Sequence, residues 1–152
     1  MSSKDLLAFD VISGKFALNT LFVHRVIQAV ELVIYPEMPS SLLGLANYGG
    51  QILPVVDIGY ITDKTKTSIK QSDFLIIFNC NNHLAAIACN SLPEIANQYK
   101  KSNSVFEQIK IKPELVEDAV IINNQIVIEL AIETILSKEM LDFIEDKEAQ
   151  SN

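Results

Sequence analysis

The sequence predicts an all-β fold, either a sandwich or a pair of small barrels, followed by one C-terminal helix. Short runs rich in β-branched and aromatic residues alternate with turn signals at short intervals, a pattern typical of sandwiches and barrels. The chain has 152 residues and a mass of 16.9 kDa, enough for one ordinary domain or for two very small barrels that share a core. Two barrels closed against each other would leave few exposed strand edges.

In the first half of the chain, four runs have the composition of strands: residues 6–12, 15–18, 31–35 and 52–56. The first two are predicted to form a hairpin across Ser13-Gly14. The apolar residues between 23 and 30 fit either a short helical turn or an irregular strand. Segment 36–58 contains three of the five glycines and three of the five prolines, which predicts sharp turns around short strands.

The second half repeats this arrangement with four further runs: residues 74–79, 83–88, 119–122 and 125–130. They are predicted to pair as two hairpins across Asn81-Asn82 and Asn123-Asn124, because asparagine tolerates the positive φ of a tight turn. A polar loop is expected at 97–104. From Ala131 the apolar period becomes helical, and Ser137 is a candidate N-cap.

The polar segment 60–72 is expected to be a loop and the place where two half-barrels meet. Residues 5–145 are predicted to form a single domain, with 146–152 as an acidic, polar tail. No apolar run approaches the roughly 18 residues of a membrane span, so no direct membrane insertion is expected. The polar N-terminus shows no signal peptide, and the expected location is cytoplasmic.

The composition argues against a nucleic-acid partner. The chain is 49% hydrophobic and 20% charged, which is globular, and its 12 basic and 19 acidic residues give a net charge of −7. Eleven of the bases are lysines, and Arg25 is the one arginine. A nucleic-acid binder needs a basic stripe to displace counterions from phosphates, and this sequence offers none.

The two cysteines are predicted to be free thiols. In the expected hairpin Cys80 lies opposite His83, and Cys89 lies opposite Phe74. The sulfurs would then be roughly 20 Å apart at ~3.3 Å per residue, beyond the ~7 Å limit between bridged Cα atoms. The Cys80-Asn-Asn-His83 spacing could serve a zinc ion, but no second His/Cys pair is nearby, and a hairpin turn explains these residues better.

Catalytic constellations are scarce, so no cofactor, metal or enzymatic activity is expected. The sequence has no HExxH, phosphate loop or GxSxG elbow. Asp57 could be a base of raised pKa, or it could accept hydrogen bonds from turn amides, which is the favoured interpretation. A small β-barrel enzyme or ligand-binding protein using Asp57, His24 or Gly49-Gly50 is the alternative from another class. A cavity that holds Asp57 and His24 together would support it.

Segment 36–58 carries a family resemblance. Its pieces are two spaced prolines, an apolar pair with glycine, a glycine turn and a Pro-containing strand: Pro36, Pro39, Leu42-Leu43-Gly44, Asn47-Tyr48-Gly49-Gly50 and Ile52-Leu53-Pro54-Val55-Val56-Asp57-Ile58. This order resembles the signature of the CheW family of chemotaxis coupling proteins. The likeness extends over residues 5 to 145, from the opening strands to the closing helix.

The resemblance implies two intertwined, five-stranded SH3-like barrels with a C-terminal helix. It also implies a non-enzymatic adaptor that couples methyl-accepting chemoreceptor tips to the regulatory domain of a CheA-type histidine kinase. An adaptor of the same kind in a type IV pilus or twitching pathway is an alternative, and so is a degenerate module that no longer couples partners.

The partner-binding residues that the resemblance implies lie along one strand and the glycine turn: Val23, Arg25, Val26, Leu43, Gly44, Asn47, Tyr48, Gly49, Gly50 and Asp57. Three positions depart from the family pattern in charge, and Tyr48 stands where relatives carry leucine. Arg25 stands where relatives carry an acid, and glycines 49 and 59 stand where relatives carry arginine. An Arg25 in the binding groove would favour a partner with an acidic contact, whereas an Arg25 facing only solvent would have no role.

Overall fold

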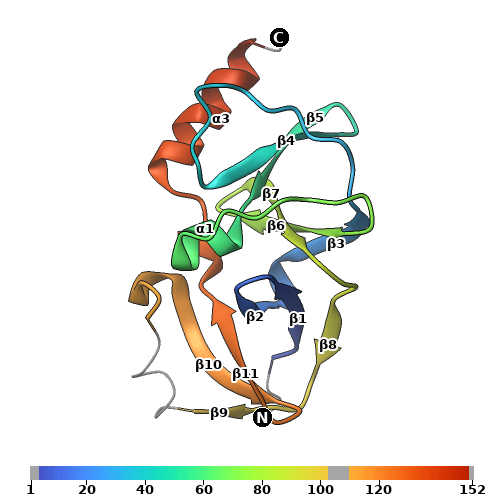
Figure 1. The fold of residues 1–152 in the computed structure, drawn as a ribbon, viewed down its shortest axis with the longest axis vertical. Coiled ribbons are helices and arrows are strands. Elements are labelled where there is room, and N and C mark those ends of the chain that lie inside the picture. The colour runs from blue at the N-terminus through green and yellow to red at the C-terminus, as the bar shows by residue number, and fades with distance from the viewer. Residues whose placement is uncertain (1–3, 103–109, 151–152) are drawn as a thin grey trace.

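In a computed structural model, which describes residues 4–102 and 110–150, the chain forms two antiparallel-rich sheets and a C-terminal helix. Figure 1 shows the two sheets one above the other along the long axis of the molecule, with the helix beside the upper one. No helix within these ranges is long and apolar enough to cross a membrane.

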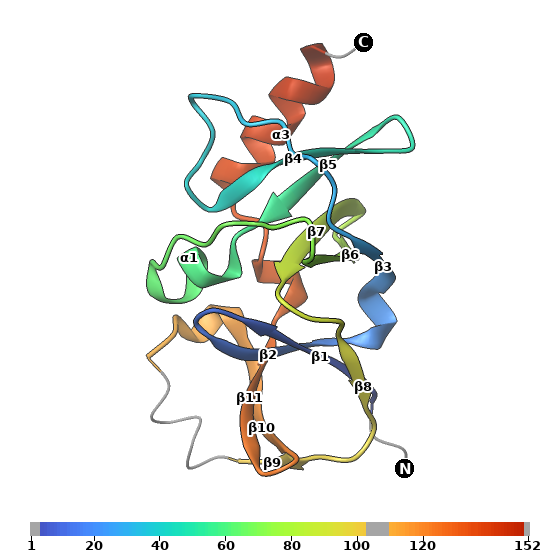
Figure 2. The same cartoon turned by 45° about the vertical axis from the view of Figure 1, so that its right-hand side comes forward.

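The lower sheet has six strands in the order β8-β1-β2-β11-β10-β9. Their bounds are β1 Leu6–Val11, β2 Gly14–Asn19, β8 Glu94–Ala96, β9 Lys100–Lys101, β10 Val116–Ile122 and β11 Gln125–Leu130. Five strands were expected, and the two-residue β9, inside the polar 97–104 segment, is the addition. Most neighbours are antiparallel, but β11 pairs with β2 in parallel. We call this unit the six-stranded barrel; Figure 2 shows how it curls.

The upper sheet has five strands in the order β3-β6-β7-β5-β4. Their bounds are β3 Val23–Gln28, β4 Leu42–Tyr48, β5 Gln51–Val56, β6 Phe74–Cys80 and β7 His83–Cys89. We call this five-stranded sheet the five-stranded barrel.

The helical elements are η1 Thr20–Phe22, α1 Ile58–Asp63, η2 Pro113–Leu115, η3 Ile132–Thr134 and α3 Lys138–Gln150.

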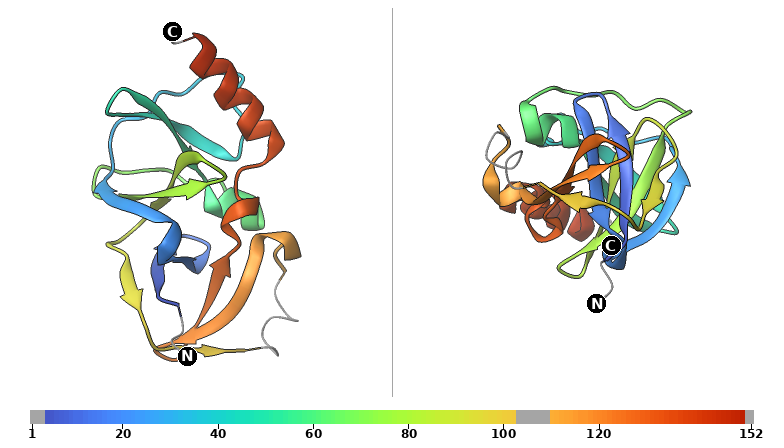
Figure 3. Two further views of the ribbon diagram at one scale, coloured as in Figure 1. Left: turned by 180° about the vertical axis from the view of Figure 1, so that it is seen from behind. Right: turned by 90° about the horizontal axis from the view of Figure 1, so that it is seen from below.

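The path of the chain corrects the expected boundary at 60–72. That segment lies between β5 and β6, inside the five-stranded barrel, and its first residues belong to helix α1. The six-stranded barrel is instead built from both ends of the chain, β1–β2 and β8–β11, around an uninterrupted β3–β7 unit. The chain therefore crosses between barrels after β2, after β7 and again after β11 (Figure 3).

The two asparagine hairpins are confirmed in turn and register. Cys80 pairs with His83, and Phe74 pairs with Cys89. All four turn asparagines have positive φ, between 49° and 69°, the conformation that a two-residue hairpin with the twist of its strands requires. Both cysteines are free and buried, as the register predicts.

The core has three layers because strand residues alternate between two buried faces. On β6 and β7, Leu75, Ile77 and Ala86 point into the five-stranded barrel, whereas Ile76 and Phe78 point into the layer between the barrels. A third cluster, which includes Leu6 and Val120, fills the six-stranded barrel. Strands buried on both faces read as continuous apolar runs, which explains the uninterrupted sequence from Phe74 to Phe78.

Two further expectations need correction. Residues 31–35 do not form a strand: only Val33 forms a bridge, to Leu45. The expected tail is helical as far as the structure describes it, since α3 continues to Gln150. Residues 151–152 lie outside the described ranges, as do 103–104 of the expected polar loop. At the other end of α3, the Ser137 hydroxyl accepts from the Met140 amide at 3.2 Å, so the predicted N-cap is confirmed.

Candidate functional site

Strand β3 and the β4–β5 turn come together on one exposed face. The ring of His24 meets the ring of Tyr48 edge to face, with centroids 6.2 Å apart, a favoured arrangement for aromatic pairs. Arg25, next to His24, is exposed, as are Asn47, Gly49 and Gly50. We call these six residues, 24–25 and 47–50, the turn face. The contact between His24 and Tyr48 brings β3, in which Arg25 follows His24, next to the turn that holds Asn47, Gly49 and Gly50.

Arg25 makes no ion pair with any residue that the structure describes. It is the chain's one arginine in a protein of net charge −7. A guanidinium presents a planar fork of donors that fits a carboxylate. The turn face can therefore bind an anionic group through Arg25.

The conformation of the glycine turn explains its two glycines. The Asn47 side-chain oxygen accepts from the Gly50 amide at 2.8 Å, and φ is +60° at Gly49 and +85° at Gly50. A Cβ added at either position would meet nothing within 4 Å. Backbone conformation, and not close packing, therefore favours glycine at both positions. An arginine at 49 would have room but would have to adopt a left-handed backbone.

Val23 and Val26 anchor the turn face from below. Both are half-buried and pack against the layer between the barrels, and a register shift in the pairing with β6 lies between Val23 and Arg25. Of the two expectations for this segment, the irregular strand is the one observed. The valines hold β3 in place, and each exposes part of its side chain.

Two exposed apolar residues beside β3 escaped the sequence analysis. Leu21 is 83% exposed and Phe22 is 41% exposed; both lie in η1, directly before Val23. Apolar side chains exposed next to one another extend the apolar part of a contact surface. Their apolar character is visible in the sequence, but periodicity alone does not say which apolar residues stay in water.

Leu43 and Gly44 are buried and so support the site from inside. A Cβ at Gly44 would lie 2.8 Å from Cβ of Leu32 and 3.0 Å from the carbonyl oxygen of Val33. Only glycine lets segment 31–35 lie this close to β4. Leu43 and Gly44 were expected to contact a partner, but they pack inside the protein instead.

Asp57 is likewise buried and structural. Its Oδ1 accepts from the Tyr60 amide at 3.2 Å and from the Thr67 hydroxyl at 2.8 Å, and its Oδ2 accepts from the Thr67 amide at 3.0 Å. It caps helix α1 and fastens the chain that follows, as the favoured interpretation predicts. Asp57 was expected to contact a partner, but its side chain is fully buried and cannot do so.

Position 59 also lies inside the protein. A Cβ on Gly59 would come within 2.7 Å of Cγ2 of Thr67 and within 2.8 Å of the carbonyl oxygen of Thr65. An arginine at this position would force the 65–67 segment away. Of the three departures from the family pattern, those at 25 and 49 therefore alter the turn face, and the one at 59 does not.

The two side chains that a small β-barrel enzyme would use, Asp57 and His24, do not lie together. His24 lies on the exposed turn face against Tyr48, whereas Asp57 is buried against Thr67. The Cys80 thiol donates to the Ile132 carbonyl at 3.1 Å, and burial raises the pKa of the Cys89 thiol to about 12. Within residues 4–102 and 110–150, no three His, Cys, Asp or Glu side chains are grouped to hold a metal ion.

The fold is therefore that of two small β-barrels that share an apolar layer, with the turn face exposed on one of them. A model of the CheW-like domain matches residues 5–140, so the chain belongs to the CheW-like domain family. Among solved structures, the scaffolding protein TtCheW from Thermoanaerobacter tengcongensis is similar, with a TM-score of 0.77 and 19% identity over 92% of this chain and 91% of that one. Both barrels are thus of the SH3-like kind. No curated protein sequence matches.

Proposed function

We propose that this protein is a cytoplasmic, non-enzymatic adaptor that couples a methyl-accepting chemoreceptor tip to the regulatory domain of a CheA-type histidine kinase. Membership of the CheW-like family supports the coupling role. The observation that supports the proposal for this chain is the turn face, where the His24–Tyr48 contact joins the exposed glycine turn to β3 and where Arg25 forms no ion pair with any described residue. No reaction is needed, since contact alone would transmit the signal.

The receptor contact is proposed to combine apolar and charged parts. Val23, Val26 and Tyr48 supply partly exposed apolar surface, and Tyr is frequent among residues that dominate binding energy because it buries a large area at little entropic cost. Asn47 and the two glycines shape the turn beside them. Arg25 then selects a receptor segment that carries a carboxylate.

The test is binding of Arg25 variants to receptor tips and kinases captured from the source cell. We expect Arg25→Glu to weaken receptor binding roughly tenfold, equivalent to about 1.4 kcal/mol, because a like charge replaces an opposite one at the contact. Lys100→Glu, an equal charge change on exposed β9 of the other barrel, is the matched control and is expected to bind like the unaltered protein. Undiminished receptor affinity of Arg25→Glu would overturn the role of Arg25.

The same capture separates the flagellar pathway from a type IV pilus pathway. Because Arg25 replaces the acid of its relatives, we expect its receptor or kinase to differ from those that bind an adaptor with an acid at this position. The identity of the captured kinase decides between the flagellar pathway and the type IV pilus pathway. Recovery of a metabolite or nucleotide with no kinase would contradict the adaptor function itself.

A further inference from the structure

His24 is an extra residue in the pairing of β3 with β6. Val23 lies opposite Phe78 of β6. Arg25 lies opposite Ile77, the very next residue of β6, so His24 has no residue of its own opposite it. A β-bulge of this kind bends its strand and redirects the side chains around it, and bulges are frequent at sheet edges. β3 is such an edge, since it ends the strand order of the five-stranded barrel.

The bulge lets Val23 and Val26 pack on the same side of β3. In a regular strand, residues three positions apart face opposite sides, because side chains alternate. Both valines nevertheless pack against the layer between the barrels, and the extra residue accounts for this. His24 and Arg25, which lie between the valines, are both exposed. The bulge therefore leaves two consecutive side chains outside, where regular alternation would turn one of them inward.

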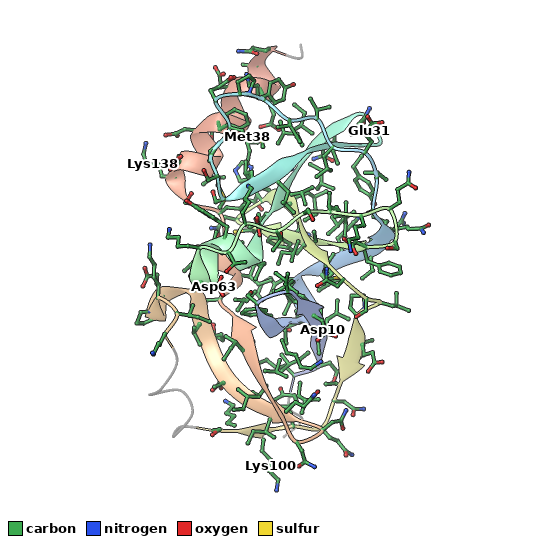
Figure 4. All side chains as sticks on the ribbon, in the orientation of Figure 1. Asp10, Glu31, Met38, Asp63, Lys100 and Lys138 are labelled. Atoms are coloured by element: carbon green, nitrogen blue, oxygen red, sulfur yellow. The ribbon has the colours of Figure 1, made fainter. Side chains whose placement is uncertain are left out.

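The ring of His24 joins β3 to a strand with which β3 does not pair. Strands β3 and β4 are fully described, and they stand at opposite ends of the five-stranded order. Residues 29–41 connect them, and Figure 4 places Glu31 of this connection at the outer border of the molecule, beside β4 and β5. His24 of β3 meets Tyr48 of β4 with ring planes at 90°. Side chains, and not backbone hydrogen bonds, therefore connect the two strands here.

Tyr48 is held by the barrel on one side and by His24 on the other. It is half-buried and packs against the apolar cluster inside the five-stranded barrel, and His24 contacts its ring from β3. The next two residues, Gly49 and Gly50, have positive φ, and glycine is the residue with the greatest backbone freedom. The order of this turn therefore depends on the side chains at its ends, of which Tyr48 is the larger.

We propose that His24 is the positioning residue of the turn face: its ring holds Tyr48 and the two glycines against β3 in the arrangement that a receptor tip binds. This inference rests on the proposed function, because it concerns the same surface. His24 acts through Tyr48 and not through a contact of its own with the partner. A tyrosine that is already fixed loses less conformational entropy on binding than a mobile one, so this contact raises affinity.

Nitrogen-15 relaxation of the isolated protein tests the positioning without a partner. Backbone order parameters of Gly49 and Gly50 are expected near the ~0.85 of a rigid backbone, and His24→Ala should lower them by at least about 0.1, toward the values of flexible segments. His24→Phe should keep them high, because a phenyl ring can form the same edge-to-face contact. Unchanged order parameters in His24→Ala would overturn the proposal.

His83→Ala is the matched control for the relaxation measurement. His83 is the chain's other histidine and begins β7, where it pairs with Cys80 across the Asn81-Asn82 turn. Its replacement removes the same imidazole from a different hairpin of the same barrel. The order parameters of Gly49 and Gly50 should therefore stay as in the unaltered protein, and an equal loss in this variant would contradict a specific role of His24.

A double-mutant cycle on the binding of captured receptor tips tests how His24 acts. We expect His24→Ala to weaken binding roughly threefold to fivefold and Tyr48→Ala roughly tenfold. Because His24 acts through Tyr48, the double variant should bind no more weakly than Tyr48→Ala alone. His24→Phe should bind like the unaltered protein, since it keeps the ring contact.

The outcomes of the cycle separate the positioning role from the proposed function. Additive losses in the double variant would mean that His24 contacts the partner itself. An equal loss in His24→Phe and His24→Ala would mean that the imidazole matters and not the ring contact. Either result would overturn the positioning role. Receptor tips that do not bind the unaltered protein would overturn the proposed function instead, and the relaxation measurement would still decide whether His24 fixes the turn.

Discussion

At the scale of the residue, the most unusual group is the carboxylate of Glu129. It points into the six-stranded barrel, 2% exposed, and its Oε2 lies 2.7 Å from the Lys4 ammonium. Its Oε1 has no hydrogen-bond partner among the described residues. Burial raises the pKa of Glu129, although the pairing with Lys4 opposes this shift. The ion pair with Glu129 joins Lys4, near the N-terminus, to the six-stranded barrel. Burying the Glu129 carboxylate with one oxygen unsatisfied lowers the free energy of unfolding.

This pair predicts a pH-dependent difference between the unaltered protein and Glu129→Gln. Because the folded-state pKa of Glu129 lies above its unfolded value, its favourable contribution is fully present below the unfolded pKa and is lost as pH rises through the folded one. The free energy of unfolding of the unaltered protein, minus that of Glu129→Gln, should therefore be more positive near pH 4 than at pH 7. Urea unfolding of both proteins at the two pH values measures it, and a difference that moves the other way would contradict it.

At the scale of the element, the asparagine hairpins were predictable because their determinants are local. Two adjacent asparagines between apolar runs specify both the turn and the pairing register. The single bridge at Val33 was not predictable from the 31–35 run, since β-rich composition does not say whether a partner strand lies beside it. Helix α1 was not predicted: the sequence suggested that Asp57 accepts hydrogen bonds from turn amides, but its role as the N-cap of a helix and the close approach of Gly59 to the 65–67 segment are revealed only by the folded chain.

We expect the left-handed turn residues to respond to substitution according to backbone strain alone. Asn82 has φ +69°, so Asn82→Ala should lower the free energy of unfolding by about 1 kcal/mol, whereas Asn82→Gly should leave it unchanged or raise it. Chemical denaturation measures both. Asn97→Ala, at an exposed position outside the residues of positive φ, serves as the control and should have little effect. Equal losses for alanine and glycine at 82 would indicate that the side chain matters instead.

At the scale of the whole molecule, the layer between the barrels is shared by both of them and by the C-terminal helix. Phe78 of β6 is fully buried there, together with Phe9, Phe16 and Ile144. The sequence predicted barrels and a helix but placed their boundary wrongly. Which strands join which barrel depends on pairings such as β11 with β2, between residues more than a hundred positions apart, and local patterns carry no information about them.

The shared layer predicts that both barrels unfold as one cooperative unit. Phe78→Ala should lower the free energy of unfolding by about 3–5 kcal/mol and reduce amide-exchange protection in strands of both barrels. Ile126→Ala, at an exposed position, should change it by less than about 0.5 kcal/mol. Loss of protection confined to β3–β7 would show that the barrels are independent.

The three crossings of the chain between barrels have a mechanical consequence for an adaptor. If a single linker joined the barrels, one barrel could rotate about it while the other stayed in place. A displacement of a partner bound to one barrel would then not be transmitted to the other. Here the crossings after β2, β7 and β11 run in parallel, and an apolar layer fills the space between them. We therefore expect a displacement of a partner bound to one barrel to move the other barrel by a similar amount, because the two barrels move as one rigid body.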